Sequence, residues 1–300
     1  MSRTLLQLIQ QGSGEMGLAQ PSSVIGSSIT QTLQFLALTQ RLGLDLIREY
    51  EWRRLTKAYI FLPTNDAYSS TGTTTEGSTG VSGLASTGNL QIGDVVSGEG
   101  IPPYTEVDSI FSSTFVFLNR YATATGPPTL TFSRQDYALP GDFNRMIDDT
   151  QWDRTNSRMN TGAQSSQYWQ AVQGGLITRL TSSQYRLYNN ALRIFPAPAT
   201  IVSLGYEYVS NYWVLAGSTP KAAFTIDSDT CVFPDDLMLA GIKYYFLKAK
   251  RLDYSAELAE FSEKLSLCKS QDQPAMVQSL ARTYSDNLVG NIPDGNWTLT

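Results

Sequence analysis

The feature that most constrains the fold of this chain is a run of small polar residues in its first third. Residues 69–88 read SSTGTTTEGSTGVSGLASTG, and 16 of these 20 positions are Ser, Thr or Gly. Such a composition offers few side chains for a hydrophobic core and is typical of a flexible linker or loop. We therefore expect the chain to be organised in parts around this run.

The residues that follow the run differ from the rest of the chain in pattern and in charge. Short apolar and β-branched stretches, separated by Gly, Pro and Ser, predict β-strands. Residues 66–133 hold seven charged residues, and Arg120 is the only cation among them. We predict that 66–133 is a small inserted β module with a Ser/Thr/Gly-rich linker.

The flanks of this module show helical periodicity. Apolar residues recur at helical spacing from about residue 29 to 52 and again over 235–269, where Pro234 and two aspartates predict a helix start. Between them, residues 184–210 alternate apolar and polar positions, which predicts antiparallel strands, with a hairpin at Asn189-Asn190.

These patterns predict an α+β protein. The expected architecture is a helical bundle core with an antiparallel β region, an inserted small β module and a C-terminal extended tail. In chain order, the predicted parts are an N-terminal helical part of the core (1–65), the inserted β module (66–133), the antiparallel β part of the core (134–233), the C-terminal helices (234–269) and a tail (270–300). The tail can pack little by itself but keeps apolar anchors in Trp297 and Leu299.

The sequence contains no histidine. Its absence excludes Ser–His and Cys–His nucleophile systems and histidine-ligated zinc sites. The two cysteines, Cys231 and Cys268, lack the spacing of a zinc or redox site and read as free thiols in a reducing compartment. We expect no enzyme, and no catalytic, cofactor-binding or metal-binding residue.

Charge and hydropathy exclude two classes of partner. The formal net charge is −5, so the chain lacks the basic footprint of a protein that grips nucleic acid. No apolar run reaches the 18 residues that a membrane-spanning helix needs. A chain of this kind is expected to be made in the cytoplasm and to bind no membrane.

One stretch, YALPGDFNRMIDDTQWDRTN at residues 137–156, concentrates charge in a chain in which only 16% of residues are charged. We interpret it as a structural ion-pair joint, formed by Arg145, Asp148, Asp149, Asp153 and Arg154. A hard-cation site and a catalytic carboxylate pair stay open as alternatives. The spacing matches no calcium loop, and the two arginines stand where they can neutralise the aspartates.

Several stretches, taken in order, resemble the head-to-tail adaptor (tail accessory) proteins of short-tailed bacteriophages. They are TLLQLIQQGSGEMGLAQPSSV (4–24), EYEWRRLTKAYIF (49–61), YALPGDFNRMIDDTQWDRTNSR (137–158), RLYNNALRIFPAP (186–198), GYEYVSNYWV (205–214), FPDDLMLAGIKYYFLKAK (233–250) and FSEKLSLCKS (261–270). The inserted module departs from that pattern.

The resemblance implies a virion protein at the head–tail interface, made in the host cytoplasm. Twelve copies would form a ring beneath the portal protein, and the opposite face would receive the tail nozzle or the tail spike or fibre proteins. The channel would retain packaged DNA and then pass it during ejection, without sequence-specific binding.

The resemblance also suggests where the portal and neighbouring subunits bind. The expected interface residues are Tyr254, Leu258, Phe261, Leu265, Met276, Leu280, Tyr284 and Trp297. The first four follow the alternating spacing of a heptad seam.

Two other classes of function stay open. The chain can be another tail or virion component, such as a fibre- or spike-attachment or glycan-binding protein, because it is rich in Tyr and carries the β module. A cell-wall hydrolase would need two carboxylates about 5–10 Å apart across a cleft, and the sequence frames no such pair.

Overall fold

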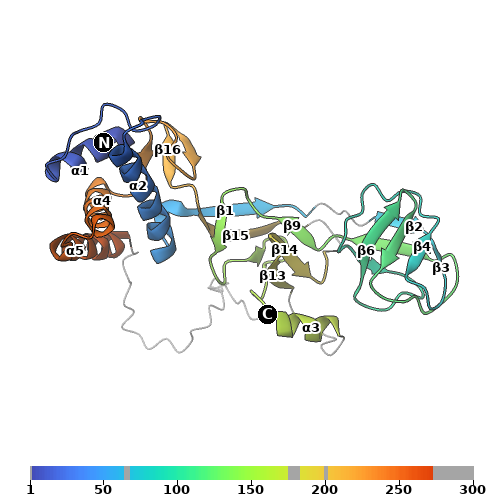
Figure 1. Cartoon of the computed structure of the whole chain (residues 1–300). Coiled ribbons are helices and arrows are strands. Elements are labelled where there is room, and N and C mark those ends of the chain that lie inside the picture. The colour runs from blue at the N-terminus through green and yellow to red at the C-terminus, as the bar shows by residue number, and fades with distance from the viewer. Residues whose placement is uncertain (1, 64–67, 175–182, 199–201, 273–300) are drawn as a thin grey trace, which may run out of the picture.

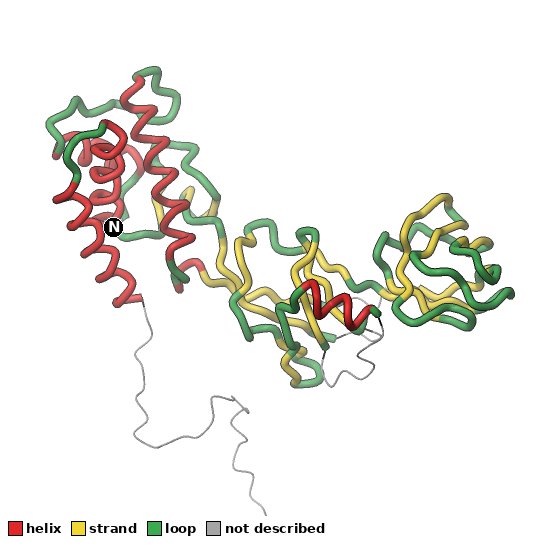
Figure 2. Tube along the Cα trace, turned by 60° about the horizontal axis from the view of Figure 1, so that its bottom comes forward, coloured by secondary structure: helices red, strands yellow, loops and turns green. Residues whose placement is uncertain are grey.

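The computed structural model describes residues 2–63, 68–174, 183–198 and 202–272. These residues form an elongated molecule of three parts in a row (Figure 1). We call them the helical lobe, the central β region and the β module. Figure 2 shows that the helices gather in the lobe, apart from one helix beside the central strands.

The helical lobe combines four helices with a small sheet. Its elements are α1 (Leu5–Glu15), α2 (Thr30–Glu49), α4 (Asp235–Lys250), α5 (Ser255–Asp272), β16 (Val214–Ala216), β17 (Thr219–Lys221) and β18 (Thr230–Cys231). The strands pair in the order β17-β16-β18. A short 3-10 helix, η1 (Arg53–Leu55), leads from this lobe into the central region.

The central β region contains two sheets and one helix. A five-stranded sheet is formed by β1 (Thr56–Phe61), β10 (Phe143–Met146), β11 (Trp152–Asp153), β12 (Arg158–Met159) and β15 (Leu204–Ser210). A three-stranded sheet has the order β13-β14-β9, with β9 at Asp136–Ala138, β13 at Gln184–Tyr188 and β14 at Ala191–Phe195. The helix is α3 (Ser166–Gln173).

The β module is a seven-stranded sheet with its own core. Its strands, in the order β2-β8-β5-β6-β7-β4-β3, are β2 (Tyr68–Thr71), β8 (Thr129–Ser133), β5 (Val95–Ser97), β6 (Thr105–Ser112), β7 (Phe115–Leu118), β4 (Gly80–Ser82) and β3 (Thr73–Thr74). The Ser/Thr/Gly run is therefore more than a linker, because it supplies three strands. It also buries Val81 and Leu84 in the module core.

The expected helical bundle core is wrong. The described residues form mostly antiparallel sheets, of five, three, three and seven strands, and the helices cluster at one end. The physical reason lies in what the helices bury. The core of the lobe contains Trp213, Val214 and Phe233 from the strands and loops around β16 and β18, so the helices pack on sheet residues as well as on each other. Of the predicted C-terminal tail, residues 270–272 belong to α5, and residues 273–300 lie outside the described residues.

Helix boundaries and the hairpin agree with the sequence pattern. The helical periodicity over 235–269 corresponds to two helices, since α4 ends at Lys250 and α5 begins at Ser255. The hairpin is confirmed too, because Asn189 and Asn190 both adopt positive φ between the paired strands β13 and β14.

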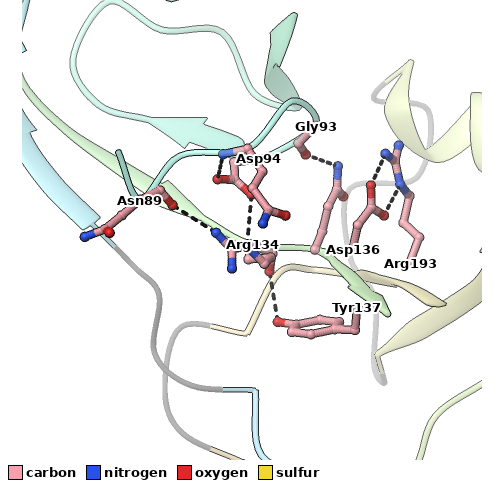
Figure 3. A network of polar contacts seen from close by, with 9 residues as sticks. Asn89, Gly93, Asp94, Arg134, Asp136, Tyr137 and Arg193 are labelled. Atoms are coloured by element: carbon pink, nitrogen blue, oxygen red, sulfur yellow. Dashed lines mark hydrogen bonds and ion pairs between the residues drawn. The ribbon is translucent and has the colours of Figure 1, made fainter. Parts of the chain in front are cut away.

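A network of polar contacts joins the β module to the central region (Figure 3). The Arg193 guanidinium donates two hydrogen bonds of 2.6 Å to the Asp136 carboxylate and lies 3.6 Å from Glu106 of the module. Gln135 donates to the Gly93 carbonyl and to Glu106, both at 2.8 Å. Because Arg193 is almost fully buried, its charge is balanced by paired acids rather than by water.

In the helical lobe, Gly43 sets how closely α2 approaches the sheet. A Cβ atom at this position would lie 2.2 Å from Cη2 of Trp213. The Trp213 ring is fully buried, and its Nε1 donates to the Ala222 carbonyl at 2.8 Å. The ring therefore has no free space into which to move.

We predict that Gly43→Ala destabilises the protein by about 1–3 kcal/mol through overpacking, although alanine raises helix propensity by about 1 kcal/mol. The free energy of unfolding, measured by chemical denaturation, tests this. Gly126→Ala is the control, since no atom lies within 4 Å of its added Cβ. Equal stability of the two variants would contradict the assigned role of Gly43.

Candidate functional site

The charged stretch 137–156 lies along the five-stranded sheet. Arg145 is in β10, Asp153 is in β11, and Asp148 and Asp149 lie in the loop between these strands. Both strands pair with β15, so the stretch is folded against the strand at the centre of the sheet. The predicted joint residues thus all lie in or next to the two strands that pair with β15.

Strand register creates an exposed apolar row across this sheet. Ile60 of β1 lies opposite Gly205 of β15, Gly205 lies opposite Trp152 of β11, and Trp152 lies opposite Met159 of β12. Directly paired residues point to the same face of a sheet. Ile60 is 51% exposed, and Trp152 and Met159 are each 40% exposed. We call Ile60, Trp152 and Met159 the apolar row.

A groove runs beside the apolar row. Because Gly205 has no side chain, the Arg154 guanidinium lies over it, with Nε 2.8 Å from where a Cβ would stand. A cavity of about 530 Å³ here is lined by Asp149, Trp152, Arg154 and Glu207, among others. Glu207 also lines a neighbouring cavity of about 790 Å³. We call the two together the sheet groove.

The second cavity of the sheet groove is lined by charges of both signs. Its residues are Glu49, Tyr50, Glu51, Arg53, Thr56, Arg145, Ile147 and Glu207. The Arg145 guanidinium lies 3.6 Å from the Glu51 carboxylate, and both side chains are partly exposed. Such a pair contributes little to stability, and the groove keeps hydrogen-bonding groups open to a ligand.

The predicted ion pairs of the joint are not made inside the described chain. Arg145 turns to Glu51, and no ion pair of the described residues links Arg154 to Asp148, Asp149 or Asp153. Asp153 instead accepts hydrogen bonds from the backbone N–H groups of Thr155 and Asn156, both at 3.0 Å. It therefore shapes a turn. Pairing of these residues across to another subunit stays a prediction.

The buried polar joint of this stretch is Asp142, which lies outside the predicted set. Its carboxylate accepts hydrogen bonds from Lys57 Nζ at 2.5 Å, Ser210 Oγ at 2.7 Å and the Tyr208 hydroxyl at 2.8 Å. Burial tends to raise the pKa of Asp142, but the hydrogen bonds from Lys57, Ser210 and Tyr208 outweigh it and lower the pKa below its ordinary value.

The structure offers no metal centre or reactive thiol in the part of the chain that it describes. No group of three or more His, Cys, Asp or Glu residues there could hold a metal ion. Cys231 and Cys268 are both unpaired and buried, and burial raises the pKa of Cys231 to about 12. A thiol in that state is a poor nucleophile. None of the described helices is long and apolar enough to span a membrane.

The predicted interface residues fall into two groups. On α5, Phe261 and Leu265 pack half-buried on the core of the lobe, and Leu258 is 40% exposed. Tyr254, just before α5, packs its ring at 5.6 Å from that of Tyr244. An apolar cavity of about 270 Å³ lies among α2, α4 and α5. The remaining predicted residues, Met276, Leu280, Tyr284 and Trp297, lie outside the described residues.

No protein-family model matches this chain, and a search of curated proteins finds no match.

We predict that Asp142→Asn destabilises the protein by about 2–3 kcal/mol at pH 7, because Lys57 loses its charged partner and two hydroxyls lose a carboxylate acceptor. The folded pKa of Asp142 lies below the unfolded value of about 3.9, so the contribution is complete above that value. It is lost as the pH falls through the folded pKa.

Denaturation curves from pH 7 to pH 2 measure both effects. The stability difference between the wild type and Asp142→Asn should shrink below about pH 4. Asp148→Asn serves as the control, because Asp148 is exposed and should change stability by less than about 0.5 kcal/mol. If Asp142→Asn were as stable as the wild type at pH 7, Asp142 would not be the joint.

Proposed function

We propose that this chain is the head-to-tail adaptor of a short-tailed bacteriophage, which forms a ring between the portal and the tail. The observation that carries the proposal is the exposed apolar surface of the helical lobe. Helix α5 has 18 residues, and Cys268 is its only buried one. Leu258 and Leu267 on α5 and Leu33 and Leu44 on α2 are all 40% exposed or more.

Exposed leucines on two neighbouring helices favour a lobe that other protein surfaces cover. Scattered apolar residues are ordinary on a surface, and Leu258 and Leu267 lie on opposite faces of α5, so the four leucines offer separate contact points to more than one neighbour. Copies of the chain packed side by side, with the portal against them, would bury these leucines. The order of the sequence stretches that resemble adaptor proteins supports the same reading.

The elongated shape also supports an adaptor. The helical lobe and the β module stand at opposite ends of the molecule (Figure 1). In a ring built from the lobes, the modules can project outward without disturbing contacts between subunits. The net charge of −5 suits a protein that borders a DNA passage without holding the DNA.

A second candidate is another tail component that attaches spikes or fibres or binds glycans. One observation favours it. Phe111, Phe115 and Phe117 form an aromatic cluster on the module, with ring centroids 5.0–6.2 Å apart, and Phe111 is 75% exposed. Exposed aromatic clusters are typical of contact surfaces. This function would place the main contact on the module rather than on the lobe.

The adaptor proposal is tested by mass measurements on the purified chain, alone and mixed with the portal ring of the same phage. We expect a species near the 33.1 kDa of one chain when alone, and about twelve copies bound to each portal ring. Deleting residues 270–300 should abolish binding. If the chain does not bind the portal, or forms a stable trimer alone, the result would favour the second candidate.

Point variants locate the contact surface. Leu267→Glu should leave the unfolding midpoint of the free chain nearly unchanged, because Leu267 is 53% exposed, but should lower the number of copies on the portal at least tenfold at equal concentration. Ile92→Glu is a matched control, since Ile92 is an apolar residue of the β module that is 66% exposed, more than Leu267. Equal loss of binding in both variants would argue against a contact made by the helical lobe.

A further inference from the structure

The sheet groove and its apolar row form an exposed face in the middle of the molecule, with the Arg154 guanidinium lying over Gly205 between Ile60 and Trp152. Ile60, Trp152 and Met159 expose apolar surface on three strands of one sheet, and Leu62, just beyond β1, is 61% exposed. Leu62 follows Ile60 at a spacing of two, so in an extended chain both point to the same side. A face of this kind is normally covered by another segment or another protein.

The described chain ends at the rim of this groove. Helix α5 finishes at Asp272, and the Asp272 carboxylate accepts a hydrogen bond of 2.8 Å from the backbone N–H of Arg53. Arg53 is one of the residues that line the groove. Residues 273–300 therefore start from the edge of an exposed apolar and polar face.

We propose that the C-terminal segment of this chain docks in the sheet groove of the same copy, with Trp297 and Leu299 against the apolar row. Trp297 and Leu299 are two residues apart, so in an extended segment their side chains lie on one side, about 7 Å from each other. The alternating sequence Trp297-Thr298-Leu299-Thr300 suits an extended segment with one apolar edge. This inference goes beyond the proposed function and does not depend on it.

The length of the segment allows this docking. A flexible chain of about 24 residues, as between Asp272 and Trp297, has a root-mean-square end-to-end distance of about 25–30 Å. The strand order β1-β15-β11-β12 spans three strand spacings, which amount to about 15 Å. The segment therefore reaches the apolar row without being stretched, at an effective concentration in the millimolar range.

The charges of the groove also suit this occupant. Its lining contains five acidic residues and three arginines, so the groove is only weakly negative. Residues 273–300 contain one arginine, Arg282, and two aspartates, Asp286 and Asp294, among mainly apolar and uncharged polar residues. A nearly neutral segment with apolar anchors fits such a groove, whereas a polyanion such as DNA would meet Glu49, Glu51 and Glu207.

Cysteine cross-linking of the full-length chain tests the proposal. In Ile60→Cys with Leu299→Cys, mild oxidation should give a disulfide within one chain, seen as a faster-migrating monomer on a non-reducing gel. Adding Trp297→Ser should slow this reaction at least fivefold. The control pair is Phe111→Cys with Leu299→Cys, because Phe111 is more exposed than Ile60 but lies on the β module.

A second measurement needs no new cysteine. A docked segment shields Met159, so peroxide should oxidise Met159 at least threefold faster in Trp297→Ser with Leu299→Ser than in the wild type. Met16, in the helical lobe, should react equally in both proteins. The proposal would be overturned if the control pair cross-linked equally fast or if disulfides formed only between copies of the chain. Unchanged oxidation of Met159 in the double serine variant would also overturn it.

Both measurements use the free chain without a portal. If they showed no docking of the C-terminal segment, the expected number of copies on the portal ring would not change. Conversely, a chain that does not bind the portal can still bind its own C-terminal segment. If the chain is the adaptor proposed above, docking of this segment on the portal would withdraw it from the groove.

Discussion

The central β region depends on the hydrogen bonds that the Asp142 carboxylate accepts. Asp142 accepts hydrogen bonds from Lys57 at the start of β1 and from Tyr208 and Ser210 on β15, and its own backbone carbonyl accepts from Asn211. A charged group at a buried position is favourable only when its hydrogen bonds are satisfied. Asp142 therefore fixes the strand that comes from the helical lobe, the central strand and the segment that returns from the β module.

The far end of the molecule is held by the same kind of chemistry. Arg193 on β14 ties Asp136, which follows the last module strand, to Glu106 within the module. Both joints use one buried or half-buried cation and carboxylates from distant parts of the chain. Buried ion pairs of this type give orientation more reliably than net stability. The β module is thus joined to the central region by specific polar contacts as well as by the chain itself.

Local patterns predicted local structure well, and long-range contacts account for the errors. Periodicity located α2, α4 and α5, and the residue type at Asn189 and Asn190 located a hairpin. Both features depend on residues that are close together in the sequence. No pattern could pair Asp142 with Lys57, which lies 85 residues away. The helical bundle was wrong because an amphipathic stripe does not say whether a helix or a sheet will cover it. The apolar row could not be predicted either, because it depends on which residues of β1, β15, β11 and β12 pair with one another.

Within the short stretch 137–156, burial distinguishes aspartates with a structural role from aspartates that are open to binding. Asp142 and Asp153 are buried and satisfied by hydrogen bonds, so they hold the sheet and a turn in place. Asp148 and Asp149 are exposed and need no partner to be stable, and Asp149 lines the groove. Structural and binding roles thus fall to different members of one charged cluster. The exposed members, with Arg145, Arg154 and Glu207, are those that an incoming segment would meet.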